Sequence, residues 1–128
     1  MGEEQKKKIL VVEDNPSAGD ILKMTLEDIG LYETFLASDA MQAGIATQRH
    51  KPDLVILDIM LPAGGGIAVY NRMKQSALTK DIPIIITTAT PVEKVKELMK
   101  TDNIREPLFK KPYDMEKLLA EIRRILGT

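Results

Sequence analysis

The sequence predicts an α/β fold in which a doubly wound, five-stranded parallel sheet is covered by helices on both faces. Three observations lead to this prediction. Short apolar runs alternate with segments of helical periodicity, several of the runs end in a charged residue, and 128 residues suit a single domain. Right-handed crossovers between parallel strands leave few topologies open, and the doubly wound sheet is the leading one.

Five short apolar runs are predicted to form the strands. A parallel strand that is buried on both faces reads as a continuous apolar run rather than as an alternating one. Turn-forming or charged residues bound each run, which argues against one long helix. The runs cover residues 9–12, 35–37, 54–57, 82–86 and 108–109.

The first helix has clear signals at both ends. Asn15 can accept hydrogen bonds from free N–H groups of the first turn, and Pro16 suits that turn because its missing N–H is not needed there. Gly30 is expected to end the helix in a left-handed conformation. The predicted apolar face consists of Ile21, Leu22, Leu26 and Ile29.

Four more helices are expected after the first. Ser38 is predicted to cap the second, which runs before Pro52. The third is predicted over about residues 67–75, the fourth from near Pro91, and the fifth after Asp114 as its cap. Their apolar positions are Met41 and Ile45, then Val92, Val95 and Leu98, and finally Leu118, Leu119, Ile122 and Ile125.

The composition indicates a globular protein, and the lack of a long apolar run leads us to expect it in the cytoplasm. Hydrophobic content of 44% and charge of 29% are typical of a folded domain. A net charge of -1 argues against nucleic-acid binding through bulk electrostatics, and the absence of cysteine excludes disulfides and thiolate metal sites. No signal peptide or membrane helix is expected, because no apolar run is long enough. Lysines 6–8 are interpreted as a solvated tail.

Charged residues follow three of the predicted strands. Glu13 and Asp14 come after the first, Asp58 ends the third, and Lys111 follows the fifth. The carboxyl ends of parallel strands lie along one edge of the sheet, where ligands bind. These charged groups are therefore expected to converge on one site.

Such a site suits phosphoryl chemistry. Crowded carboxylates favour a hard cation, Mg²⁺ or Mn²⁺, and a carboxylate beside it can act as a nucleophile towards phosphorus. Lys111 and the hydroxyl of Thr88 could neutralise and bind phosphoryl oxygens. Each residue alone has an ordinary explanation: an Asp can cap a helix, a Thr favours strands, and Lys-Pro makes turns. The joint pattern carries the prediction.

In this order and spacing, the motifs resemble those of the receiver domain of two-component response regulators, as in the bacterial chemotaxis regulator. The resemblance covers residues 7–126 and leaves residues 1–6 as an N-terminal tail. The matching pieces are residues 9–15, residues 52–58 with Pro62 and Gly66, residues 83–89, and residues 110–113.

The resemblance implies a flavodoxin-like (βα)5 fold with strand order 2-1-3-4-5 and a role for each site residue. Asp58 would be the phosphoacceptor. Asp14 would bind Mg²⁺ directly, Glu13 largely through water, and Met60 through its backbone carbonyl. The phosphoryl group would be contacted by Thr88, the backbone of Ala89 and Lys111, and the peptide bond before Pro112 would be cis.

The sequence departs from the family at the switch. The family usually has an aromatic residue three positions before its lysine, and this chain has Leu108. Alternation along the strand is expected to point Phe109 to the other face, and Thr87 away from the Thr88 side. Residues 64–66, all glycine, are interpreted as a flexible loop, because a phosphate-binding P-loop needs a Lys-Ser/Thr that is absent. His50 is expected at the surface.

The function implied is signalling rather than metabolic catalysis. A histidine kinase or phosphotransfer protein would donate the phosphoryl group, and the surface of the fourth helix, fifth strand and fifth helix would bind an effector or a second copy. A homodimer is possible, and no direct contact with nucleic acid or membrane is expected.

Three alternatives compete with this function. A phosphatase of the haloacid dehalogenase type needs a second Asp two residues after the first, where this chain has Met60. A flavodoxin-like cofactor binder needs a phosphate loop in place of residues 13–16. A degenerate receiver that only docks other proteins has Leu108 as its best support.

Overall fold

The computed structural model describes residues 5–128, and the parallel sheet at its centre has the predicted strand order. The five strands are ordered β2-β1-β3-β4-β5, and every neighbouring pair is parallel. The strands are β1 (Lys7–Val12), β2 (Tyr32–Ala37), β3 (Leu54–Asp58), β4 (Ile84–Thr88) and β5 (Leu108–Lys110).

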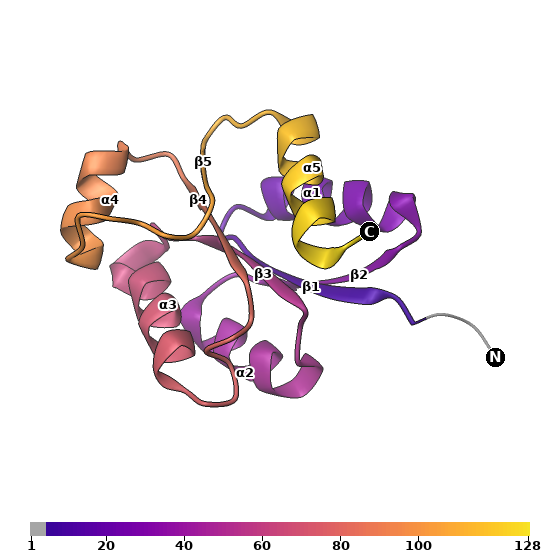
Figure 1. Ribbon diagram of the computed structural model, residues 1–128, viewed down its shortest axis with the longest axis horizontal. Coiled ribbons are helices and arrows are strands. Elements are labelled where there is room, and N and C mark those ends of the chain that lie inside the picture. Colours follow the sequence, from indigo (N-terminus) through magenta and orange to yellow (C-terminus); the bar gives the residue numbers. More distant parts are fainter. Residues whose placement is uncertain (1–4) are drawn as a thin grey trace.

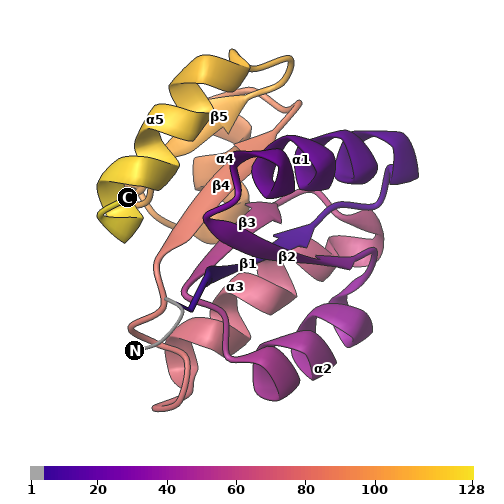
Figure 2. The ribbon, with the colours of Figure 1, turned by 90° about the vertical axis from the view of Figure 1, so that its right-hand side faces the viewer.

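Helices cover both faces of this sheet (Figures 1 and 2). Two of them, α1 and α5, lie on one face, and α2 and α3 lie on the other with α4 at the β4–β5 end. Their bounds are α1 (Pro16–Ile29), α2 (Ala40–His50), α3 (Gly65–Gln75), α4 (Val92–Met99) and α5 (Met115–Leu126), with a short 3₁₀ turn η1 (Pro62–Gly64) before α3. None of the described helices is long and apolar enough to cross a membrane.

The core forms two clusters, one on each face of the sheet. Alternate side chains of β3 enter opposite clusters: Val55 and Leu57 pack towards α2 and α3, while Leu54 and Ile56 pack towards α1 and α5. All five residues of β3 are buried. The continuous apolar run in the sequence therefore marks a strand that is covered on both faces.

Three helix ends follow the predicted signals and one differs. Asn15 caps α1 and Gly30 ends it in a left-handed conformation, and Asp114 caps α5. The predicted cap Ser38 is wrong, because Asp39 accepts the hydrogen bond from the N–H of Gln42. Ser38 instead donates to the side chain of Gln42, so both polar residues serve the same helix end.

The strand boundaries also differ from the predicted ones. Lys7 and Lys8 belong to β1 rather than to a solvated tail, and the N–H of Lys8 donates to Asp53 Oδ2 at 2.8 Å. The remaining predicted tail includes residues 1–4, which lie outside the described residues. β4 begins at Ile84, after Pro83, and continues to Thr88.

The glycine-rich segment is the start of a helix instead of a flexible loop. Gly64 adopts a left-handed conformation and α3 begins at Gly65. Gly66 is required by a close approach: a Cβ on it would lie 2.2 Å from the carbonyl oxygen of Ile59. His50, expected at the surface, is half-buried and stacks on Phe35 with 3.7 Å between ring centroids.

Candidate functional site

The predicted site residues come together at one edge of the sheet. Glu13 directly follows β1, Asp58 is the last residue of β3, Thr88 is the last residue of β4, and Lys111 directly follows β5. Because all these strands are parallel, their carboxyl ends share this edge. The fold therefore places two carboxylates, a hydroxyl and an ammonium group from distant parts of the sequence at the same edge.

Three carboxylates form the acidic half of the site. Each of Glu13, Asp14 and Asp58 offers one oxygen, and these oxygens lie within 4.8 Å of one another. The N–H of Glu13 donates to the carbonyl of Ala37 at 2.9 Å, which continues the β1–β2 pairing by one residue. Its Oε2 accepts from the N–H of Asn15 at 3.2 Å. The residue that caps α1 thus also holds a site carboxylate in place.

Asp58 is buried, with a relative exposure of 6%, and both of its oxygens accept hydrogen bonds. Oδ1 accepts from the backbone N–H of Met60 at 2.9 Å, and Oδ2 accepts from Lys111 Nζ at 3.0 Å. The next residue, Ile59, donates its N–H to the carbonyl of Thr87 at 3.0 Å. The carboxylate is held by backbone on one side and by a cation on the other.

Lys111 joins the carboxylates. Its Nζ lies 2.6 Å from Glu13 Oε1 and 3.0 Å from Asp58 Oδ2. Burial by itself lowers the pKa of this ammonium, but the hydrogen bonds and negative charges of Glu13 and Asp58 outweigh burial and raise the pKa above its ordinary value. Lys111 is therefore a permanent positive charge at neutral pH. The peptide bond between Lys111 and Pro112 is cis.

The end of β4 supplies a hydroxyl at the same edge. Thr88 is fully buried, and its Oγ1 accepts from the N–H of Thr90 at 2.9 Å, while Ala89 is exposed. The carbonyl of Thr88 accepts from the N–H of Lys111 at 2.7 Å, which ties the lysine to this strand. Thr87 alternates with Thr88 and so shares the face of Ile85, which packs towards α1 and α5.

The switch position lacks an aromatic ring on the Thr88 side. Leu108 is half-buried against the core cluster under α2, α3 and α4. Phe109 packs on the opposite cluster, where its ring meets that of Tyr113 edge-on at 6.4 Å. The expected alternation of these two residues is confirmed, so Phe109 does not replace the missing aromatic residue.

One polar connection, between α3 and the segment before β5, has no signal in the sequence. The hydroxyl of Tyr70, in α3, donates to Glu106 Oε2 at 2.9 Å, and Lys74 Nζ lies 3.3 Å from the same oxygen. Burial, together with the hydrogen bond to Glu106 and its charge, raises the pKa of Tyr70 to about 12. Glu106 lies just before β5, and the pair is separated by 36 residues, so only the fold reveals it.

The acidic cluster fits a hard divalent cation. Its donors are all carboxylate oxygens, which Mg²⁺ and Mn²⁺ prefer, and no nitrogen or sulfur donor belongs to the cluster. Asp14 is also exposed, so water can complete the coordination at that side of the cluster. Lys111 balances only part of the negative charge of the three carboxylates, so a bound cation would be stabilised by the charge that remains.

Comparisons with known proteins agree with this geometry. A family model described as the response regulator receiver domain matches residues 9–123. The chain is 32% identical over 119 residues to the DNA-binding dual master transcriptional regulator RpaA of Synechocystis sp., which covers 93% of this chain and 48% of RpaA. It is 35% identical over 120 residues to the phosphate regulon transcriptional regulatory protein PhoB of Pseudomonas aeruginosa, covering 94% of this chain and 52% of PhoB.

The chain therefore spans about half the length of the curated relatives it matches. A solved structure with a similar fold is the receiver domain of the sensor histidine kinase PA1611 of Pseudomonas aeruginosa, which has a magnesium ion coordinated in the active site cleft. It shares 25% sequence identity with a TM-score of 0.82, and the match covers 97% of this chain and 100% of that one.

Proposed function

The chain belongs to the response regulator receiver domain family, and on that premise we propose that Asp58 accepts a phosphoryl group from a histidine kinase or a phosphotransfer protein. One observation carries the proposal. The Asp58 carboxylate ends a fully buried strand, lies among two further carboxylates, and accepts a hydrogen bond from Lys111. We infer that the domain spans residues 7–126 and acts in signalling, not as a metabolic enzyme.

A divalent cation, Mg²⁺ or Mn²⁺, would be held by Asp14, Glu13 and Asp58 together with the backbone carbonyl of Met60. The oxygen-only donor set and the magnesium ion of the related PA1611 receiver support this assignment. When bound, the ion neutralises negative charge on the carboxylates and on the phosphoryl oxygens.

Phosphoryl transfer itself needs the nucleophile and its neighbours to be correctly placed. A carboxylate oxygen of Asp58 attacks phosphorus, the bond between phosphorus and the donor's histidine nitrogen breaks, and an acyl phosphate forms on Asp58. The protonated Lys111 then exchanges its contact with Asp58 Oδ2 for one with a phosphoryl oxygen. Thr88, through its hydroxyl, and Ala89, through its backbone N–H, would bind the remaining oxygens.

The added charge would change which partners Lys111 and Thr88 contact, and so bias a two-state equilibrium of the segment that follows β4. The surface formed by α4, β5 and α5 would be reshaped and would bind an effector protein or a second receiver. The output of this domain is then a protein–protein contact, which requires no direct binding of nucleic acid or membrane.

The experiment that tests this function is incubation with acetyl phosphate and Mg²⁺, followed by intact-mass measurement. The protein should gain the mass of one phosphoryl group, and the gain should disappear in Asp58→Asn and when EDTA removes the metal. Asp53→Asn is the matched control, because Asp53 precedes the same strand, is exposed, and contacts the N–H of Lys8 at the opposite end. It should be phosphorylated like the unmodified protein.

A phosphoryl gain that persists in Asp58→Asn would contradict the assignment of the nucleophile. If the unmodified protein gains no phosphoryl mass, the better explanation is a domain that only docks other proteins. Leu108, which replaces the usual aromatic residue of the switch, would then be the feature that supports this explanation.

A further inference from the structure

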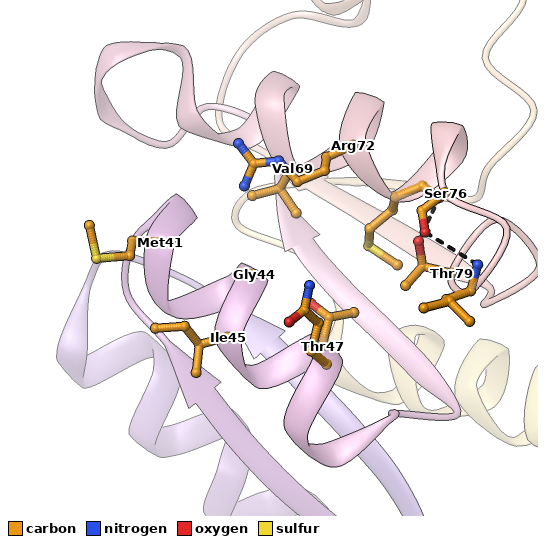
Figure 3. A pocket seen from close by; sticks show the side chains of 11 residues that line it. Met41, Gly44, Ile45, Thr47, Val69, Arg72, Ser76 and Thr79 are labelled. Atoms are coloured by element: carbon orange, nitrogen blue, oxygen red, sulfur yellow. Dashed lines mark hydrogen bonds between the residues drawn. The ribbon is translucent and has the colours of Figure 1, made fainter.

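Three exposed apolar side chains surround a hollow between α2 and α3, away from the carboxylate site. Met41 and Ile45 on α2 have relative exposures of 74% and 51%, and Leu78 after α3 has 87%. The sequence pattern suggests that Met41 and Ile45 face the core, and that prediction is wrong. The hollow has a volume of about 300 Å³, and in Figure 3 the α2 side chains stand across from Val69 and Arg72 of α3.

This hollow is an apolar groove. Buried side chains form its floor, and the turn after α3 closes one of its ends. Val69 and Met73, each 4% exposed, form part of the floor. At the far end, Ser76 shapes the turn after α3: its Oγ accepts from the N–H of Leu78 at 3.2 Å, and its carbonyl accepts from the N–H of Thr79 at 3.1 Å. This turn holds the Leu78 side chain out in solvent. An apolar side chain that enters the groove would meet a prepared surface.

Gly44 keeps the α2 wall of the groove open. A glycine inside a helix destabilises it relative to alanine, so a packing reason is usually expected. None exists here: a Cβ on Gly44 would contact only Arg72 Nη1, at the ordinary distance of 3.5 Å. The missing side chain therefore enlarges the groove instead of relieving a clash, which favours a binding function for this space.

Basic side chains outnumber acidic ones around the groove, where Asp39 before α2 and Asp81 after Lys80 are the nearest acidic residues in the chain. Neither α2 nor α3 contains an acidic residue. Arg72 lines the groove, and the exposed Arg49 and Lys80 adjoin its lining residues in the chain. Within residues 5–128 no ion pair engages these three side chains, whereas Lys74 is paired with Glu106. The apolar groove is thus bordered by positive charge that is available to a partner.

We propose that this groove binds an amphipathic helix of a partner protein, with large apolar side chains on one face and Asp or Glu residues beside them. Helices commonly bind in apolar grooves through side chains at positions i, i+3 or i+4, and i+7. The acidic residues would face Arg72, Arg49 and Lys80, and this complementary charge would make the groove selective for acidic helices. This surface is distinct from the α4–β5–α5 face and from the Asp58 site.

A second copy of the chain is the competing occupant. It could offer α1, where Ile21 and Met24 have relative exposures of 58% and 70% and the exposed Asp20 and Asp28 lie beside them. Such a contact joins two different surfaces, so each copy in a pair would keep one surface free, and assembly would continue until it closes into a ring or forms an open chain. A helix from a different protein binds once and stops, and is therefore the occupant we favour.

The test uses a short synthetic helix-forming peptide with Leu at i, i+4 and i+7 and Glu at the flanking positions. Its binding to the whole chain is measured by fluorescence anisotropy and located by NMR chemical-shift changes. The matched control peptide has Lys in place of every Glu. We expect the acidic peptide to shift resonances of α2 and α3 and to bind roughly tenfold more tightly than the Lys peptide.

Substitutions at two positions locate the interaction without relying on a damaged fold. Gly44→Leu places a side chain in the groove and replaces glycine with a good helix former, so thermal stability should be kept or increased while peptide binding weakens roughly tenfold or more. Arg72→Glu should reverse the preference between the two peptides, and Arg72→Ala should only reduce it. Phosphorylation by acetyl phosphate should be the same in Gly44→Leu as in the unmodified chain, so failure of this proposal is separable from failure of the Asp58 assignment.

Equal binding of the two peptides, or unchanged binding to Gly44→Leu, would overturn the proposal. Sedimentation velocity completes the test. Concentration-dependent assembly of the unmodified chain that is abolished by Gly44→Leu and by Met24→Glu would assign the groove to a second copy and so reject a partner helix.

Discussion

Strands β3 and β5 each deliver one charge to the site, yet they are held very differently. β3 lies between two neighbours, and all five of its residues are buried. β5 has three residues at an edge of the sheet, none of them fully buried, and it pairs only with β4. Asp58 ends β3 and Lys111 directly follows β5, and the two form a contact of 3.0 Å between Oδ2 and Nζ.

The difference separates the tasks of the two residues. The carboxylate is fixed by the core, because moving β3 would disturb both apolar clusters. The lysine belongs to the part of the chain with the least buried surface, since α4 contributes only Val95 to the fully buried residues and β5 contributes none. Local opening is easiest where few apolar contacts are broken. When the charge at Asp58 changes, we therefore expect α4 and β5 to move more than β3.

The largest effect is expected where the backbone turns away from β3. Gly66→Ala would put a Cβ 2.2 Å from the backbone carbonyl oxygen of Ile59 and 2.5 Å from the backbone carbonyl oxygen of Asp58. Because both contacts are with backbone, the free energy of unfolding should fall by roughly 3 kcal/mol or more. Urea denaturation measures this loss. In the control Gly65→Ala the new Cβ would meet side-chain atoms at 3.5 Å, and a similar loss there would show that the steric explanation is wrong.

A direct comparison of the strands comes from truncating one leucine in each. Leu57→Ala, at a position with no exposure, should cost roughly 2–5 kcal/mol. Leu108→Ala, at a half-buried position, should cost about half as much. Chemical denaturation measures the free energy of unfolding of both variants. Equal losses would show that β3 and β5 do not differ in how firmly they are packed.

Removing the lysine should unbalance the site. Lys111→Met leaves Glu13 and Asp58 without their shared partner, which should lower the free energy of unfolding by about 1–3 kcal/mol. Mg²⁺ should restore more of the thermal stability in this variant than it adds to the unmodified chain, because it supplies the missing positive charge. The neighbouring Lys110, which is exposed, provides the control Lys110→Met. A Mg²⁺ response equal in both variants would argue against a cation at this cluster.

The smallest effect concerns the link between α3 and the segment before β5. Tyr70→Phe removes the hydrogen bond to Glu106 and should cost about 1 kcal/mol. The pKa of Tyr70 is raised from 10.0 to about 12, so the folded state favours the neutral phenol. The stability difference between the two proteins should be constant below pH 10 and decline as the pH rises towards 12. Thermal unfolding of both proteins from below pH 10 to pH 12 tests this prediction. A stability difference that does not change with pH would contradict the raised pKa of Tyr70 as its cause.

Some features could be predicted from the sequence because they depend on residues close together in the chain. Asn15 caps α1 from the adjacent position, and Leu108 and Phe109 take opposite faces because strands alternate. Other features depend on distant residues. The exposure of Ile45 was not predictable, because an apolar residue on a helix reads the same whether it faces the core or a groove.

The order of strands and helices, the burial of the central strands and the charged residues at the strand ends could all be read from the sequence, since periodicity and chain order encode them directly. Three contacts could be known only from the packed domain: Lys111 bridges Glu13 and Asp58, Tyr70 reaches Glu106, and Gly44 leaves a groove open beside Arg72. Such contacts depend on distances between side chains from different elements, and the packing of the whole domain sets those distances.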